Sequence, residues 1–225
     1  MPNVKALWIQ RLGRPGVASI LAWLFLGIVS VGPGGAQTQG PVLNAARVPS
    51  PGEIRTVKVN EQTITAVYAG REGSFDCWNV KSSNGNAGKF CNTVEGNLVS
   101  RQGSVGTPVV INPHNGALSF PMFVGKQWEQ AYSYQNGSEG MRNEKRTASV
   151  VSYEKLAVTA GTFDVFKIQV TRSWWGGDLS DSQGARAGTM RGSSSQGTYY
   201  YSGKVGMVKV DDGFDHTELL ASSAK

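Results

Sequence analysis

The sequence has little of what metal and catalytic centres are built from. It contains two cysteines and two histidines in 225 residues, and neither His114 nor His216 lies near Cys77 or Cys91 along the chain. A structural metal site needs several converging ligands, so the sequence predicts no metal site and no bound cofactor. Nucleophile-elbow, phosphate-loop and dinucleotide motifs are also missing, which excludes the enzyme classes built on them.

A strong excess of one charge is missing as well. The chain has 22 basic and 16 acidic residues and a formal net charge of +6. Three of these positive charges belong to Lys5, Arg11 and Arg14, and the other basic residues are scattered along the chain. Nucleic-acid-binding domains carry basic patches or stripes, so no nucleic-acid partner is expected.

The one long apolar run lies near the N-terminus and is short for a membrane span. It covers residues 17–31 (VASILAWLFLGIVSV) and follows a basic segment; it has about 15 residues, against the roughly 20 that a span needs. Small residues follow up to Ala36, as at a signal-peptidase site. We therefore predict a signal helix in residues 1–36, cleaved after Ala36, and a periplasmic or secreted protein with no integral membrane span. An uncleaved anchor is the alternative.

The rest of the chain shows no amphipathic helical pattern and favours β-structure. Its many glycines, serines, threonines and tyrosines are typical of short strands joined by turns. Residues 37–50 lack periodicity and predict a flexible leader, and residues 51–225 predict a single β-rich domain. Strands are expected over residues 54–59, 63–68, 75–80, 89–94, 128–135, 146–158, 163–172, 198–201, 207–210 and 217–220.

These elements predict a mainly β fold, with a curved antiparallel sheet that forms a half-barrel or a partly closed barrel. Within residues 163–172 the apolar alternation changes phase at Phe166-Lys167. Such a change indicates a bulge or burial on both faces of the sheet.

Two cysteines in an exported domain predict one disulfide, Cys77–Cys91. The segment between them has turn chemistry at Asn84-Gly85-Asn86. Closing a loop of this length stabilises the fold by about 3 kcal/mol in the chain-entropy model. The spacing is not that of a catalytic redox pair, which places the two cysteines three positions apart.

Three segments carry a resemblance to a family. They are residues 120–128 (FPMFVGKQW), 156–168 (LAVTAGTFDVFKI) and 198–209 (TYYYSGKVGMVK). Together they resemble a widespread family of exported bacterial periplasmic domains of unknown function, distantly like the half-barrels of lipoprotein carriers. The resemblance covers residues 118–220 and implies a curved antiparallel sheet, but no catalytic residue. The chain departs from the family pattern at Tyr200, where tryptophan is common, and at Ser202-Gly203, where Ala-Pro is common.

Aromatic residues are the best candidates for a binding surface. Trp174 and Trp175 adjoin a polar stretch, and alternation places Tyr199 and Tyr201 on one face of a strand with Tyr200 on the other. Aromatic side chains that the core does not need often mark binding sites, although all of these residues could instead be core. The sequence thus predicts a non-enzymatic protein whose concave sheet binds an apolar or amphipathic ligand such as a lipid.

Two other functions remain open. The chain could be an interaction module that docks to an envelope protein, which predicts an apolar patch outside any groove. It could also be a hydrolase in which His216 acts with Asp212 or Asp215, since a histidine beside a carboxylate can serve as a general base. The second option requires these side chains to converge in one pocket, whereas Asp211-Asp212-Gly213 is also ordinary hairpin sequence.

Overall fold

The computed structural model describes residues 40–104, 107–135, 140–176, 193–213 and 215–224. Within these ranges the chain forms strands and turns and no α-helix, which confirms a mainly β protein. The described residues also contain no helix with the length and apolar character that crossing a membrane requires. The predicted signal helix in residues 1–36 lies outside the described residues.

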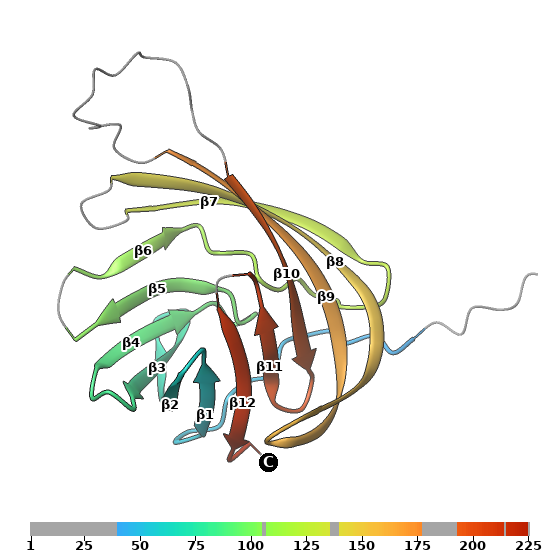
Figure 1. Cartoon of the computed structure of the whole chain (residues 1–225), viewed down its shortest axis with the longest axis horizontal. Helices are drawn as coiled ribbons and strands as arrows, with labels where there is room; N and C mark the ends of the chain where they lie inside the picture. Colours follow the sequence, from blue (N-terminus) through green and yellow to red (C-terminus); the bar gives the residue numbers. More distant parts are fainter. Residues whose placement is uncertain (1–39, 105–106, 136–139, 177–192, 214, 225) are drawn as a thin grey trace, which may run out of the picture. The chain divides into compact units, whose positions relative to one another are not determined.

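The described residues form twelve strands, and each is antiparallel to its neighbours in the chain (Figure 1). Ten of them overlap the expected strands, several of which extend further at one end than predicted, and residues 98–112 supply two more. The strands are β1 (Ile54–Val59), β2 (Gln62–Glu72), β3 (Phe75–Ser82), β4 (Ala87–Asn92), β5 (Leu98–Gly103), β6 (Val109–Asn112), β7 (Gln127–Gln135), β8 (Met141–Val158), β9 (Gly161–Gly176), β10 (Ser193–Ser202), β11 (Gly206–Asp211) and β12 (His216–Ser222).

The sheet closes fully into a barrel. β1 pairs with β12, with Thr56 opposite Ala221 and Lys58 opposite Glu218. The prediction of an antiparallel sheet is confirmed. The prediction of a half-barrel or a partly closed barrel is wrong, because the pairing of β1 with β12 closes the barrel. Alternation along one strand shows which face is buried but not which strands pair, so closure was not visible in the sequence.

The two ends of the barrel differ. Because neighbouring strands run in opposite directions, the last residues of β1, β3, β5, β7, β9 and β11 all lie at one end, here called the odd-turn end. The opposite end holds the long connection 113–126 between β6 and β7 and also the segment 40–50. We call it the plugged end.

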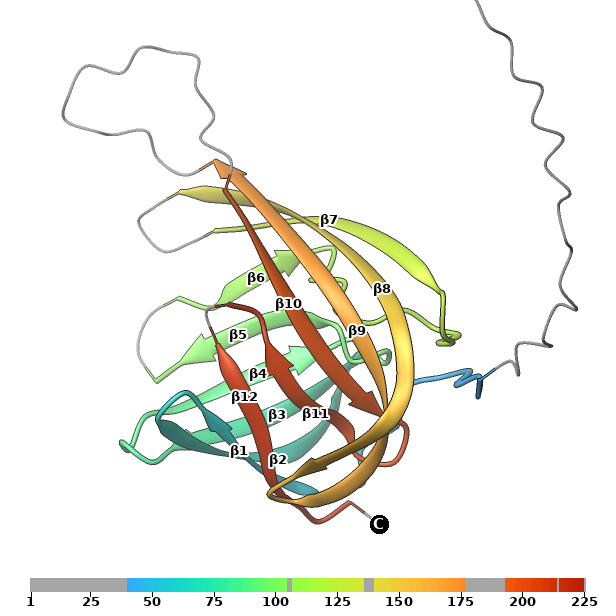
Figure 2. The same ribbon diagram turned by 45° about the vertical axis from the view of Figure 1, so that its right-hand side comes forward.

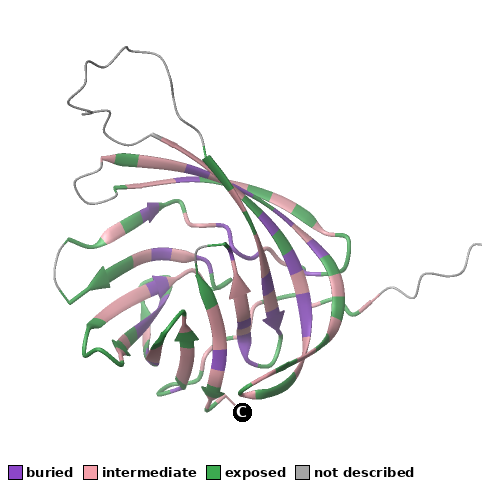
Figure 3. Ribbon diagram, in the orientation of Figure 1, coloured by how far each residue is buried: buried purple, intermediate pink, exposed green. Residues whose placement is uncertain are grey.

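The connection 113–126 fills the middle of the barrel from the plugged end. Leu118 and Met122 are buried in one core cluster with Val150 of β8 and Ile168 of β9. Buried Asn97 fixes the connection, because its side chain accepts from the Leu118 N–H at 2.7 Å and donates to the Leu118 carbonyl at 3.0 Å. Figure 3 shows how buried and exposed positions alternate along β8, β9 and β10 over this core.

Residues 40–50, from the stretch assigned to a leader, make contacts with the barrel that the sequence pattern does not indicate. Leu43 and Met122 exchange two backbone hydrogen bonds of 2.9 and 2.8 Å. Further along, the Arg47 side chain donates to Glu53 at 2.9 Å. This segment therefore covers the connection 113–126 at the plugged end.

The β8–β9 hairpin is longer than the barrel wall and curves over its outside (Figure 2). Its tip contacts β12, since the Ala160 N–H donates to the Leu219 carbonyl at 3.2 Å. Consecutive residues of β9 are therefore both buried: Val165 lies in the cluster with Leu219, and Phe166 lies in the barrel core. This burial on both faces explains the phase change, and the bulge lies on β8, between Val150 and Ser152.

Cys77 on β3 and Cys91 on β4 are register partners on adjacent strands. Their sulfur atoms lie 2.07 Å apart, at disulfide distance, and both residues are buried beside Val99. The pair therefore links two strands that a short turn already joins.

Candidate functional site

A cavity of about 240 Å³ lies inside the barrel, toward the odd-turn end. Its walls come from β5 to β10, which are half of the twelve strands, from Asn115 in the connection 113–126 and from the segment that joins β11 to β12. On the β5–β6 side the lining combines aliphatic residues with the charged Arg101 of β5, and on the β7–β10 side it is aromatic and charged. The lining residues are Leu98, Arg101, Val109, Ile111, Asn115, Tyr132, Tyr134, Glu144, Arg146, Arg172, Tyr199, Asp212 and Asp215.

Glu144 on β8 is the acceptor around which this wall is organised. It is 1 % exposed and accepts hydrogen bonds from the hydroxyls of Tyr132 and Tyr134, the second at 2.8 Å. Arg172 Nη2 lies 3.3 Å and Arg142 Nε 3.6 Å from its carboxylate. Burial alone would raise the pKa of Glu144, but these hydroxyl donors and the Arg172 charge lower it below its usual value. Glu144 is therefore a fixed negative charge.

Arg172 on β9 joins two acidic groups. Besides Glu144, it donates through Nη1 to Asp212 at 2.8 Å. Burial alone would lower the pKa of Arg172, but the neighbouring carboxylates raise it. Asp212 is itself buried and accepts from the Asp215 backbone N–H at 2.9 Å, so the turn after β11 is anchored to the cavity wall.

Arg146 on β8 differs from Arg172 in its partners. It is 4 % exposed, and its guanidinium carbon lies over the rings of Tyr132 and Tyr199, 5.7 Å from each centroid. Nη2 lies 3.4 Å from the Tyr132 hydroxyl oxygen. Nε and Nη1 are buried without a hydrogen-bond partner, and among the described residues no carboxylate lies within 4 Å of the group.

The buried polar atoms without a partner share one level of the barrel. In the described residues they are Nε and Nη1 of Arg146, Nε of Arg172 and Oγ of Ser195. Arg146 is the register partner of Arg172, which is in turn the partner of Ser195 on β10. Partners on adjacent antiparallel strands point to the same face, so the three side chains form one row across β8, β9 and β10, called here the Arg146 row.

The tyrosines predicted as site residues lie on one face, but they line different cavities. Tyr199 and Tyr201 are both buried in the barrel core, while Tyr200 packs with the outer cluster. Tyr199 lines the 240 Å³ cavity. Tyr201 lines a separate space of about 100 Å³ near the plugged end, and its hydroxyl accepts from the Arg47 N–H at 3.0 Å.

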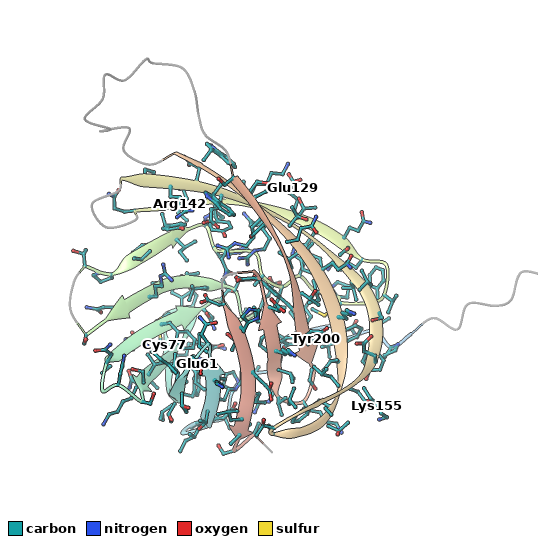
Figure 4. The ribbon with its side chains drawn as sticks, viewed as in Figure 1. Glu61, Cys77, Glu129, Arg142, Lys155 and Tyr200 are labelled. Carbon is teal, nitrogen blue, oxygen red and sulfur yellow. A yellow bond between two sulfur atoms is a disulfide. The ribbon has the colours of Figure 1, made fainter. Side chains whose placement is uncertain are left out.

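The predicted tryptophans are neighbours of the site rather than lining residues. Trp174 is the register partner of Glu144, one level beyond the Arg146 row toward the odd-turn end, and Arg142 lies 5.4 Å from its ring centroid. Trp175 points to the other face of β9, and its register partner on β8 is Asn143. Figure 4 labels Arg142, which marks this end of β8, and Lys155, which marks its far end.

The side chains of the hydrolase hypothesis do not converge. His216 is two-thirds exposed, and its Nδ1 lies 3.2 Å from Asp211. Asp212 and Asp215 line the cavity, whereas His216 is not among the lining residues. The arrangement that a histidine–carboxylate base requires is thus absent from the described residues.

Sequence reasoning missed Glu144, Arg146 and Arg172, although a signal for them is present. Glu144 and Arg146 fall in phase with buried Ala148 and Val150 along β8, and Arg172 falls in phase with Val170 along β9. Charged residues at positions where alternation demands a core side chain are rare unless they are paired or functional. Searching for charges on the apolar phase of each strand would have found them.

The known proteins that resemble this chain do so in structure. No protein-family model and no curated protein matches the sequence. One similar structure is that of a protein from Parabacteroides distasonis described as a lipoprotein, with a TM-score of 0.47, 13% identity, and coverage of 80% of this chain and 99% of that chain. Another is that of the hypothetical lipoprotein YmcC from Escherichia coli, with a TM-score of 0.46, 12% identity, and coverage of 79% and 90%.

A third similar structure is that of an exported protein with a YmcC-like fold from Bacteroides fragilis. Its TM-score is 0.41 at 13% identity, and the match covers 81% of this chain and 100% of that chain. The descriptions of these three proteins thus name lipoproteins or exported proteins, and none of them names a ligand or a reaction.

Proposed function

We propose that this chain is an exported, non-enzymatic binding protein that holds a small amphipathic ligand in the cavity at the odd-turn end. The observation that carries the proposal is the cavity itself, about 240 Å³ in volume and lined by side chains that a buried hydrogen-bond network fixes in place. Export is supported by the basic, apolar and small-residue pattern of residues 1–36 and by the buried cysteine pair.

Both halves of an amphipathic ligand find matching groups in the cavity. The rings of Tyr132 and Tyr134 stack with centroids 6.4 Å apart, and Tyr199 adds a third aromatic side chain. Arg146 and Arg172 supply polar contacts beside these rings. A purely apolar ligand is disfavoured, because Leu118 and Met122 already cover the apolar part of the concave face.

The size of the cavity limits the ligand. Binding sites for drug-sized molecules occupy about 300–1,000 Å³, and this cavity lies below that range. The proposal is therefore a molecule with one ring or a short chain and one polar group, and not a diacyl lipid.

Native mass spectrometry of protein recovered gently from a bacterial periplasm tests the proposal. A matched pair of variants gives the control, because Val109 lines the cavity while its neighbour Val110 is 62 % exposed. We expect a small-molecule adduct on the wild type and on Val110→Trp, and no adduct on Val109→Trp. If the wild type carries no adduct even after incubation with a periplasmic extract, the proposal is wrong.

A second candidate, an interaction module for an envelope protein, is favoured by one observation. Near the plugged end five apolar residues remain 39–54 % exposed: Val42, Phe123, Val124, Val151 and Tyr153. Backbone hydrogen bonds bring their segments together, since Leu43 pairs with Met122 and Gly125 donates to the Val150 carbonyl. If this surface docks a partner, cross-linking in the periplasm captures the partner with the wild type and not with a Phe123→Ser/Tyr153→Ser variant.

A further inference from the structure

We infer that the ligand is a small organic anion and that Arg146 binds its carboxylate or phosphate group. Arg172, in the same row and also part of the cavity lining, would supply an additional donor. This inference rests on the proposed function, because it assigns the chemistry of the ligand that the cavity holds. Three observations carry it: the missing partners, the placement of the charges and the position of the row.

The first observation is that a buried guanidinium is left incomplete. Arginine carries five N–H donors and no acceptor. Among the described residues Arg146 has one hydrogen-bond partner, the Tyr132 hydroxyl 3.4 Å from Nη2. The rings of Tyr132 and Tyr199 lie against the group, but they offer no acceptor oxygen to its Nε and Nη1. Buried polar groups are almost always hydrogen-bonded, so a row of unpartnered donors at a cavity wall indicates that something outside the protein bonds to them.

The second observation is the distribution of charge. Glu144 is engaged by Arg142, Arg172 and two tyrosine hydroxyls, and Asp212 is engaged by Arg172. Arg146 faces Arg172 directly across the strand pair, and like charges in that position destabilise a sheet. A buried charge without a counter-charge is costly, so the group that completes Arg146 is expected to be negative.

The third observation is the depth of the row. On the side of the plugged end, the next level of the wall is Ala148, Val170 and Gly197, which carry no polar side chain. On the side of the odd-turn end, the next level holds Glu144 and Trp174. The Arg146 row is therefore the deepest charged level that this wall contributes to the cavity lining, because the deeper lining residue, Tyr199, carries no charge. The acidic end of a bound molecule would enter first.

Calorimetric titration of the purified mature protein tests the inference. The probes are inorganic phosphate and benzoate, which distinguish a phosphate from a carboxylate ligand, and sodium chloride at equal ionic strength is the control. The variants are Arg146→Met, which removes the charge at similar length, and Arg146→Lys, which keeps a charge but loses the planar set of donors. Lys58→Gln is the matched control, because it removes one positive charge from a half-exposed side chain outside the cavity.

We expect the wild type and Lys58→Gln to bind one equivalent of at least one probe and to melt at a higher temperature in its presence. Arg146→Met is expected to weaken binding by about tenfold to a hundredfold, the range for losing charge-assisted hydrogen bonds. The affinity of Arg146→Lys for the probe is expected to lie between the affinities of the wild type and of Arg146→Met. If Arg146→Met does not fold, the comparison of Arg146→Lys with Lys58→Gln gives the answer.

Two results would overturn the inference. Unchanged affinity in both Arg146 variants would show that the anion binds elsewhere, and binding of neither probe by the wild type would show that water completes the Arg146 row. The proposed function survives both results if native mass spectrometry still finds a neutral adduct that Val109→Trp removes. It fails as well if no adduct of any kind is found.

Discussion

Arg146 on β8 and Arg172 on β9 lie directly opposite each other inside the barrel, but within the described part of the chain only Arg172 has carboxylate partners. The carboxylates of Glu144 and Asp212 balance the charge of Arg172, although its Nε has no hydrogen-bond partner among the described residues. Arg146 lacks a carboxylate partner there, and both its Nε and its Nη1 are buried without a hydrogen-bond partner. Sequences that specify one fold usually satisfy each buried polar group, and departures concentrate at functional sites. The difference between Arg146 and Arg172 therefore indicates that the acidic group of a ligand binds at Arg146.

Glu144 is expected to make the protein sensitive to acid. Its pKa is lowered in the folded state, so its contribution to stability is present above the ordinary glutamate pKa and is lost as the pH falls through the lowered value. The free energy of unfolding should therefore decrease as the pH drops below about 4.5, the ordinary glutamate value. Urea unfolding between pH 3 and pH 7, bracketing that value by roughly two units, measures this.

The Glu144→Gln variant is the control for that titration. At neutral pH it should be less stable by about 3 kcal/mol, because it leaves Arg172 short of a buried counter-charge. Its stability should also fall less steeply in acid than that of the wild type. Some acid sensitivity should persist through Glu53, whose pKa is lowered by the side chains of Arg47 and Arg55 against the opposing effect of burial. Parallel pH curves for the two proteins would contradict this role of Glu144.

Gly197 on β10 is expected to tolerate no side chain. A Cβ there would lie 2.6 Å from Asp212 Cα and 2.7 Å from the Asp211 carbonyl oxygen. Gly197→Ala should therefore displace the turn that holds Asp212 against Arg172, at a cost of about 1–3 kcal/mol, and should weaken ligand binding. Gly40→Ala, where the new Cβ meets only Val124 at 3.6 Å, should change the free energy of unfolding by less than about 0.5 kcal/mol. Equal effects of the two substitutions in urea unfolding would argue against this packing.

The connection 113–126 is expected to be a structural part of the core. Met122 is fully buried, whereas Met141 is 53 % exposed. Met122→Ala should lower the free energy of unfolding by about 2–5 kcal/mol, and Met141→Ala should change it by less than about 0.5 kcal/mol. A small effect at Met122 would mean that the connection does not fill the barrel in solution.

The cysteine pair is expected to stabilise the barrel without shaping the binding site. The Cys77–Cys91 bond closes a loop with a sequence separation of 14 and lies outside the cavity lining. A Cys77→Ser/Cys91→Ser variant should lose about 3 kcal/mol of stability and keep the affinity for the anionic probe. Loss of binding at a temperature where the variant is still folded would contradict this separation of roles.

Much of the fold was visible in the sequence because strands are local. The positions of β1 and β2 followed from two β-rich runs that a short gap separates, and the structure turns the chain there at Asn60, whose φ is positive. The phase change at Phe166-Lys167 correctly indicated burial on both faces of β9. Closure of the sheet was not visible, because it depends on β1 pairing with β12 across the whole length of the domain.

The binding site was harder to predict than the fold. Alternation placed Tyr199 and Tyr201 on one face, but it could not show that the two side chains line separate spaces inside the barrel. Arg146 matters because its Nε and Nη1 find no hydrogen-bond partner among the described residues. That depends on the side chains of β8, β9 and β10 together, which the sequence of one strand does not show. A charge in phase with a buried apolar stripe is the local signal that remains, and it identifies the residue but not its ligand.

A crystal structure of the protein as purified from the periplasm tests the central claim most directly, because it shows what bonds to Nε and Nη1 of Arg146. The account predicts the acidic group of a small molecule within hydrogen-bond distance of these atoms, with its remaining part against the rings of Tyr132 and Tyr199. Only ordered water at the Arg146 row, or a protein carboxylate turned toward it, would contradict the account.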